Sequence, residues 1–512
     1  MVANEIRLKN ALALLIFPIF CYLALIVKWG YEFGRGDQIE ILPYSLILNG
    51  NSNFQHDFFY QSILKILPNE RWFISKLISL FGQNTQLFVF IIHFLSTIFL
   101  IIGMEKLGNL LINNKLATRI TIFLTLVLFN YYYNLGGNEL YYNNLQGSSI
   151  AKSLGIWSIY FLFVEKLNKT AICLLIATLF HPIVGFQLNV LLLGILLFFY
   201  FKNKNSYSFK IPFITIVLSF AFLISIQLAY KKANMGFPNT NFSQIIFHFR
   251  NGHHYIPSQF QLNGWILLSF SFLFSFIYFW QKTVVKLWIS LSFLFILFYL
   301  VGLGFEILPI ISMQAFKLTI WIKYLGILSF FGLAIKYFPI LKKYAEIKHQ
   351  YFIYFFGSIF GLLFLVFAPS TFFPDNVKYD FGYQTNNDDA IKISLFAKKM
   401  TTKDAIFIVP SNFTEIAFYG QRSCYISDKA NPKYPKAAKE WASRIFTIYG
   451  LDYRVKNPKW WLANQNYEQK LQNSLIDYKK LGITHIICTS TLKNNVKFEK
   501  KAGKYKLYSL RK

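Results

Sequence analysis

Charged residues are scarce in this chain. Of its 512 residues only 15% are Asp, Glu, Lys or Arg, whereas 55% are hydrophobic and 20% are aromatic. A soluble domain is usually nearer a quarter charged. Apolar runs of about 18–20 residues recur along the first three-quarters of the chain, and each is long enough to cross a bilayer. The composition therefore indicates a polytopic α-helical membrane protein.

Cysteines and nucleotide-binding motifs are also scarce or missing. The four cysteines have no metal-site spacing and are too few for a dense disulfide framework. Cys21 and Cys173 lie within apolar runs, whereas Cys424 and Cys488 could form a disulfide if their strand-like runs are neighbours. The chain has no GxGxxG motif, no P-loop and no internal repeat, so nucleotide binding is unsupported. The net charge of +29 fits Lys-rich cytosolic loops and does not require nucleic acid as a partner.

The apolar runs predict roughly eleven membrane spans. They lie near residues 11–27, 87–104, 117–129, 148–163, 171–180, 183–200, 211–230, 263–280, 284–301, 308–335 and 351–368. Lys and Arg gather in alternate connecting segments, which are normally cytosolic. We therefore expect a cytosolic N-terminus, a retained first span and an external C-terminal segment.

A long external loop, residues 29–86, follows the first span. A short turn would suffice to link two spans, so a loop of this length needs another reason. We expect its stretch Phe33–Gln61 to form the floor of an external site. The polar candidates in this stretch are Arg35, Asp37, Glu40, His56 and Asp57.

Asp37 is the catalytic candidate among these residues. The glycines on its N-terminal side allow a tight turn and the close approach of a ligand. Alternatively, Asp37 could be the N-cap of a helix over Ile39–Leu48. Asp57 could cap or orient the loop or take part in the site directly. A helix over Arg71–Leu80 could lie at the membrane interface.

Further candidates lie in later external segments. His181 precedes Pro182 at a turn between two apolar runs, where it could bind phosphate or hold the turn. The stretch with His248, Arg250, His253 and His254 suits phosphate or pyrophosphate, and its spacing is not diagnostic of zinc.

Two lysines lie inside a long apolar stretch. Lys317 and Lys323 would be costly at that depth unless they face a cavity or a partner, and Lys317 could meet a lipid phosphate. Glu139 and the tyrosines around it could form a sugar-facing surface or an interfacial aromatic belt.

The composition changes after the last span. We expect residues 1–370 to form a transmembrane domain and residues 371–512 a small external α/β domain. Short strands are expected in AIFIVP, CYISD, THIICT and YKLYSL, with Ala405–Val409 at the centre of the sheet. Helices are expected over Tyr434–Tyr449 and Tyr467–Leu481. Arg422, Asp428, Lys429, Trp441 and Arg444 are expected to cluster, with Arg444 pairing Asp428.

The layout resembles the GT-C class of integral-membrane glycosyltransferases. It shares with them a cytosolic N-terminus, an acid soon after the first span, many spans and a small external C-terminal domain. The chain also resembles a group of poorly characterised bacterial polytopic membrane proteins. The residues behind this second resemblance are Gly36-Asp37-Gln38, His181-Pro182-x-x-Gly185 and Arg422…Asp428-Lys429…Pro432…Trp441-x-x-Arg444.

The GT-C resemblance implies a catalytic base and a donor. By position, Asp37 would be the base, and the donor would be a polyprenyl-phosphate-linked sugar. The protein would be a multi-pass protein of the bacterial cytoplasmic membrane, with a periplasmic C-terminal domain. Many members have two adjacent acids in the first loop, whereas Gln38 follows Asp37 here, so a divalent metal stays open and no other cofactor is assigned.

Three functions remain open at this point. In a glycosyltransferase, Asp37 would be the general base, and Arg250, His253, His254 or Lys317 would stabilise the leaving phosphate. In a transporter of lipids or solutes, lysines would line a polar path, although the chain lacks inverted repeats. The third function is a non-catalytic subunit of an envelope complex, with membrane lipid and other proteins as partners.

Overall fold

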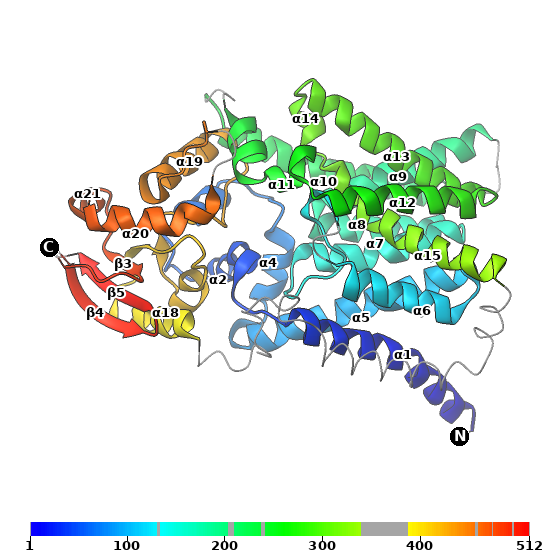
Figure 1. Ribbon diagram of the computed structural model, residues 1–512, viewed down its shortest axis with the longest axis horizontal. Helices are drawn as coiled ribbons and strands as arrows, with labels where there is room; N and C mark the ends of the chain where they lie inside the picture. The colour runs from blue at the N-terminus through cyan, green and yellow to red at the C-terminus, as the bar shows by residue number, and fades with distance from the viewer. Residues whose placement is uncertain are drawn as a thin grey trace. The chain divides into compact units, whose positions relative to one another are not determined.

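The computed structural model describes residues 2–130, 134–202, 209–236, 241–338, 388–455, 459–473, 475–493 and 496–510. These residues are mostly helical, with a small sheet near the C-terminus (Figure 1). The predicted span near 351–368 lies outside the described residues.

Six helices among the described residues are long and apolar enough to cross a membrane. They are Gly82–Ile112, Pro182–Phe201, Lys210–Ala233, Leu262–Phe279, Thr283–Gly304 and Leu308–Tyr337. Two shorter apolar helices cover Leu14–Trp29 and Leu167–Phe180. A helical membrane protein with several spans is therefore confirmed, whereas the count of eleven and the orientation stay predictions.

The chain divides into two compact units. Unit 1 contains residues 1–31, 90–223 and 253–379, and unit 2 contains residues 32–89, 224–252 and 380–512. Unit 2 therefore joins the long loop after the first helix to two segments far away in the sequence.

Unit 1 is a helical assembly in which small residues allow close helix packing. A Cβ atom on Gly326 of α15 would lie 2.3 Å from the Cα atom of Ser271 on α12, and a Cβ on Gly185 of α9 would lie 2.4 Å from the Cα of Thr178 on α8. Such close backbone approach is typical of helices packed within membranes. Its helices are α1 (Val2–Trp29), α5 (Thr85–Ile112), α6 (Lys115–Phe123), α7 (Gly147–Phe163), α8 (Leu167–Phe180), α9 (Pro182–Phe201), α10 (Lys210–Ala233), α12 (Leu262–Phe279), α13 (Thr283–Gly304), α14 (Leu308–Ile311) and α15 (Thr319–Tyr337), of which α5 and α10 each continue into unit 2.

Unit 2 contains one five-stranded sheet, with strand order β2-β1-β3-β5-β4. Its β1 pairs in parallel with β2 and β3. Strand β5 pairs antiparallel with β3 and β4, and these three strands are labelled in Figure 1. The strands are β1 (Ile406–Ile408), β2 (Ser423–Cys424), β3 (His485–Cys488), β4 (Val496–Ala502) and β5 (Tyr505–Leu510). Strand β1 is an interior strand as its apolar sequence predicts, but β3 takes the middle position.

The order of the strands in the sheet also shows whether Cys424 and Cys488 can form a disulfide. Cys424 lies on β2 and Cys488 on β3, and β1 separates these two strands. Both cysteines are free and buried, so the disulfide that the sequence left possible does not form.

The helices of unit 2 come from all three of its segments. The long loop supplies η1 (Gly36–Glu40), α2 (Leu42–Leu48), α3 (Phe58–Leu64), α4 (Trp72–Ser79) and η2 (Gly82–Asn84). The middle segment supplies η5 (Gln244–Arg250), and the C-terminal segment supplies α18 (Asp389–Met400), η10 (Ile416–Gly420), α19 (Pro435–Tyr449), η11 (Trp460–Leu462), α20 (Ala463–Asn473) and α21 (Leu475–Lys480). The helix expected over Tyr434–Tyr449 is confirmed. The one expected over Tyr467–Leu481 begins earlier, at Ala463, and is helical on both sides of residue 474, which lies outside the described residues.

Candidate functional site

Asp37 lies on η1 with its side chain exposed. The N-cap residues of η1 and α2 are Arg35 and Ile41, so Asp37 is not the N-cap of either helix. The backbone N–H of Gly34 donates to Gln38 Oε1 at 2.7 Å and thereby closes the turn that precedes η1. The structure therefore presents Asp37 on a short, internally bonded turn.

The C-terminal segment holds this turn from one side. The N–H of Gly36 donates to Thr414 Oγ1 at 3.1 Å, and the Tyr419 hydroxyl donates to the carbonyl of Phe33 at 3.0 Å. Gly34 has a φ of +73°, and a Cβ atom there would lie 2.6 Å from the Tyr419 ring. Glycine is thus required at this position by both backbone conformation and close packing.

Arg35 links the turn to two acids of the C-terminal segment. Its Nη2 lies 2.5 Å from Asp388 Oδ2, and its Nε lies 3.4 Å from Glu415 Oε1. Asp388 is also the N-cap of α18, because its carboxylate accepts from the N–H of Ala390 at 2.8 Å. Burial raises the pKa of Glu415 to about 7, although Arg35 opposes this shift.

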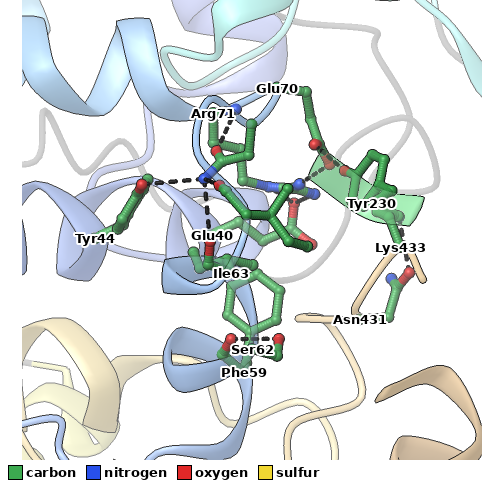
Figure 2. Close-up of polar contacts among 12 residues, drawn as sticks. Glu40, Tyr44, Phe59, Ser62, Ile63, Glu70, Arg71, Tyr230, Asn431 and Lys433 are labelled. Atoms are coloured by element: carbon green, nitrogen blue, oxygen red, sulfur yellow. Dashed lines mark hydrogen bonds and ion pairs between the residues drawn. The ribbon is translucent and has the colours of Figure 1, made fainter. Parts of the chain in front are cut away.

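Glu40, the last residue of η1, belongs to a partly buried ionic cluster (Figure 2). Arg71 Nε donates to Glu40 Oε2 at 2.6 Å, and Arg71 also donates to Glu70. The hydroxyl of Tyr230, near the end of α10, donates to the other carboxylate oxygen of Glu70. The cluster therefore joins η1, the segment before α4 and the end of α10.

The charges in this cluster shift the proton affinity of its members. Burial alone would raise the pKa of Glu70, but Arg71, Tyr230 and Lys433 together hold it below its usual value. Burial lowers the pKa of Lys433 to about 8, although the nearby carboxylates oppose the shift. The Lys433 amine also donates to Asn431 Oδ1 at 2.8 Å (Figure 2).

Asp57 is the buried N-cap of α3. Its Oδ1 accepts from the N–H of Tyr60 at 3.2 Å, and its Oδ2 accepts from the N–H of Cys424 at 2.8 Å. Burial raises its pKa to about 6, and these backbone donors oppose the shift. The neighbouring His56 is exposed, with its Nε2 3.9 Å from Asp404. Asp57 thus fixes the loop against β2.

Arg250 holds a loop of the C-terminal segment. Its Nε donates to the backbone carbonyl of Asp428 at 2.7 Å, and its guanidinium lies over the Trp460 ring at 5.6 Å. Trp441 supports the same loop, because its indole N–H donates to the carbonyl of Ser427 at 2.9 Å. Burial raises the pKa of the Asp428 carboxyl. His248, two residues before Arg250, is exposed.

The predicted pair between Arg444 and Asp428 is wrong. Arg444 Nη2 instead lies 2.6 Å from Glu440, one turn earlier on α19, and its Nη1 donates to the carbonyl of Tyr425. The guanidinium also lies over the ring of Phe58 at 4.4 Å. Arg444 therefore pairs with Glu440, its i,i+4 neighbour, and contacts the aromatic residues Phe58 and Tyr425 instead of Asp428.

The other predicted residues lie in unit 1. His181 is the N-cap of α9, and its Nδ1 accepts from the N–H of Val184 at 3.2 Å. The rings of His253 and His254 lie 4.0 Å apart, and His254 Nδ1 lies 2.8 Å from the carbonyl of Gly136. His181 thus has a structural contact that its position before Pro182 already suggested.

The backbone of Lys317 contacts the turn of unit 1 that the two histidines also contact. The Asn138 amide donates to the carbonyl of Lys317 at 3.2 Å. Nearby, the fully buried Lys152 donates to the carbonyl of Glu139 and lies over the Tyr142 ring at 4.1 Å. Lys323 donates to the carbonyl of Phe129 at 2.7 Å.

Lys152, Glu70, Arg71 and Lys433 were not among the predicted site residues. A single lysine inside an apolar helix is a usable signal for Lys152, because such charges are rare within membranes. No local signal distinguishes the other three from ordinary loop charges. Among the described residues, no group of three or more His, Cys, Asp or Glu side chains could hold a metal ion.

One protein family matches part of the chain. The family model described as a domain of unknown function (DUF6798) matches residues 388–448, from the N-cap of α18 to the last turn of α19. Comparison with curated proteins finds no match. The matched stretch is a minor part of the chain and carries no named activity.

Proposed function

We propose that the chain is a GT-C-type glycosyltransferase with Asp37 as its general base. It would move a sugar from a polyprenyl-phosphate-linked donor to an acceptor on the external face of the membrane. The observation that supports this proposal is that Asp37 is exposed on a segment whose other members Phe33, Gly36 and Glu40 are bonded to distant parts of the chain.

Fixed neighbours suit a catalytic carboxylate. A general base acts only when it is held within hydrogen-bond reach of the proton that it accepts. Sites whose supporting residues are locked by packing and hydrogen bonds keep that geometry best.

The reaction is a displacement at the anomeric carbon of the donor sugar. The acceptor hydroxyl forms the new bond to this carbon while its proton passes to the Asp37 carboxylate. The bond from the carbon to the donor phosphate oxygen breaks, and the lipid phosphate leaves with the electron pair. Arg250, His253, His254 or Lys317 is proposed as the cation that stabilises the leaving phosphate.

The candidate spans support a donor carried on lipid. Nucleotide sugars are cytosolic, so a transferase that acts outside the membrane needs its donor in the bilayer. We further propose a bacterial cytoplasmic membrane, a cytosolic N-terminus and a periplasmic C-terminal segment, because the basic residues gather in alternate connecting segments.

Asp37→Asn tests this function. The substitution keeps size and hydrogen bonding but removes the basic carboxylate, so we expect sugar transfer to fall by about 10²–10⁴-fold while donor binding is kept. Product formation is measured with extracted lipid-linked sugars and purified full-length protein. The matched control is Asp404→Asn, because Asp404 is also exposed and should tolerate the change. Full activity of D37N would exclude Asp37 as the base.

The buried lysines of unit 1 favour a transporter as the second candidate function. Lys152 and Lys323 are both buried, and charges inside a membrane domain often mark a solute path. Reconstituted vesicles distinguish the two functions. A transporter moves solute across sealed vesicles without changing a sugar bond, whereas a glycosyltransferase forms product in detergent.

A further inference from the structure

Helix α4, Trp72–Ser79, is apolar on two opposite sides. Its inner side carries Ile74 and Ile78, which are buried, and this helix packs on α2. The outer side is formed by four positions spaced i, i+3, i+4 and i+7, and three of these are apolar. They are Phe73, Lys76, Leu77 and the following Leu80.

The outer side is partly open, because Lys76 and Leu80 are exposed whereas Phe73 and Leu77 are half-buried. Leu80 is 68% exposed, and Lys76 is exposed as well. Leu67, shortly before the helix, is 54% exposed, and Phe81 directly after Leu80 is exposed too. A helix at a water-facing surface normally carries polar residues on its outer side. The exposed apolar surface of Leu67, Leu80 and Phe81 therefore fits apolar surroundings better than water.

Both ends of α4 adjoin candidate membrane spans. The span Gly82–Ile112 begins two residues after Leu80. At the other end, Glu70 binds the hydroxyl of Tyr230, which lies near the end of the span Lys210–Ala233. Glu70, Leu80, Gly82 and Tyr230 all belong to unit 2. The ends of two candidate spans therefore flank α4.

We propose that α4 lies in the plane of the membrane interface and inserts its outer side into the bilayer. Leu67, Leu80 and Phe81 would contact the acyl chains next to the headgroups. Lys65 and Lys76, both exposed, would extend their amines to lipid phosphates while their methylene groups stay among the chains. Anionic headgroups complement these two charges.

The placement ties the lipid surface to the turn that carries Asp37. Arg71, the N-cap residue of α4, binds Glu40 on η1, and Ser75 of α4 donates to the carbonyl of Ile41 at 3.1 Å. The turn therefore stays at a set depth relative to the bilayer. Nothing in this placement depends on the proposed transfer reaction, and its test requires no activity.

Leu80→Cys with a nitroxide label tests the placement. The full-length chain, with its four native cysteines replaced by alanine, is reconstituted in nanodiscs of phosphatidylcholine and phosphatidylglycerol. Collision rates of the label with oxygen, which prefers the bilayer, and with a water-soluble nickel chelate are measured by spin resonance. We expect the ratio of oxygen to nickel collisions to be several-fold higher for L80C than for the control Phe498→Cys.

Phe498 is a matched control because it is an exposed apolar residue of the same unit, 55% exposed on β4. Equal collision ratios for L80C and F498C would overturn the proposal. If L80C does not fold, Leu67→Cys decides between the same two outcomes, since its label lies on the same surface.

Discussion

Glu415 is a buried carboxyl that lies beside Arg35, and burial raises its pKa from 4.5 to about 7. A pKa that is higher in the folded than in the unfolded chain means that the folded state holds its proton more tightly. The corresponding stabilisation is complete below pH 4.5 and is lost as the pH rises through about 7. His485 shifts in the opposite direction, because burial lowers its pKa to about 4. The contribution of Glu415 to stability is therefore isolated by comparing, at each pH, the unmodified chain with a variant that lacks this carboxyl.

Glu415→Gln should gain stability relative to the unmodified chain as the pH rises from 5 to 8. Glutamine cannot ionise, so the variant avoids the cost of a buried charge. The difference in unfolding free energy should shift in favour of E415Q by up to about 3 kcal/mol, at about 1.4 kcal/mol per pKa unit. Thermal unfolding of the detergent-solubilised chain at both pH values measures it. A difference in unfolding free energy that does not change with pH would contradict the raised pKa of Glu415. The contribution of His485 is the same in both proteins and cancels in this difference.

At the same scale, the sequence identifies residue types better than residue partners. The composition around Asp37 was a sufficient signal for an exposed acid on a glycine-rich turn. Thr414 and Tyr419, which bind Gly36 and Phe33 in this turn, lie more than 370 residues away, and no local pattern encodes such contacts. For the same reason Arg71 was not expected to bind Glu40, and Arg444 was paired with the wrong acid.

Elements with a strong period and clear ends are predictable from sequence. Helix α19 begins at Pro435 and ends before Gly450, which has a φ of +67°, and these are ordinary start and stop signals. Helix α20 begins directly after the aromatic turn η11, and that stretch carries no such signal. The predicted strand Ala405–Val409 was found, but its place in the sheet depends on pairing partners elsewhere in the chain.

Replacement of the glycine in the turn before η1 gives a further prediction. Gly34→Ala and Gly50→Ala both introduce a side chain at positive φ, which costs about 1–2 kcal/mol. Only Gly34 also faces a side chain, that of Tyr419, whereas no atom lies within 4 Å of a Cβ on Gly50. We expect G34A to lower the thermal midpoint more than G50A does, and to lose sugar transfer. Similar midpoints and full activity in both variants would show that the contact with Tyr419 does not hold the turn.

On the scale of the whole molecule, membrane spans are the most predictable feature. Length and hydropathy alone identify them, because the bilayer sets the required length. The helices near 117–129 and 148–163 were also located, but they are not among the six spans of sufficient length and hydropathy. The membership of the long loop in unit 2 could not be predicted, because it rests on contacts such as that of Arg35 with Asp388.

The predicted orientation of the chain in the membrane can be tested with fusions at its C-terminus. An alkaline phosphatase fused after Lys512 should be active, because this enzyme folds only outside the cytosol and alternate basic segments place the C-terminus there. A green fluorescent protein at the same position should remain dark after export. The reverse pattern would overturn the orientation and the external placement of Asp37.

The three-part composition of unit 2 has a consequence for the order of synthesis. The loop 32–89 leaves the ribosome first, yet Ile39 and Phe59 share a hydrophobic cluster with Ala417 and Ala430. At roughly 5–20 residues per second, the ribosome needs on the order of tens of seconds to reach that partner segment. During this interval the loop can pack its apolar residues on one another, but the part of the cluster that Ala417 and Ala430 cover stays open. We therefore expect the membrane or chaperones to shield this part of the nascent chain until translation is nearly complete.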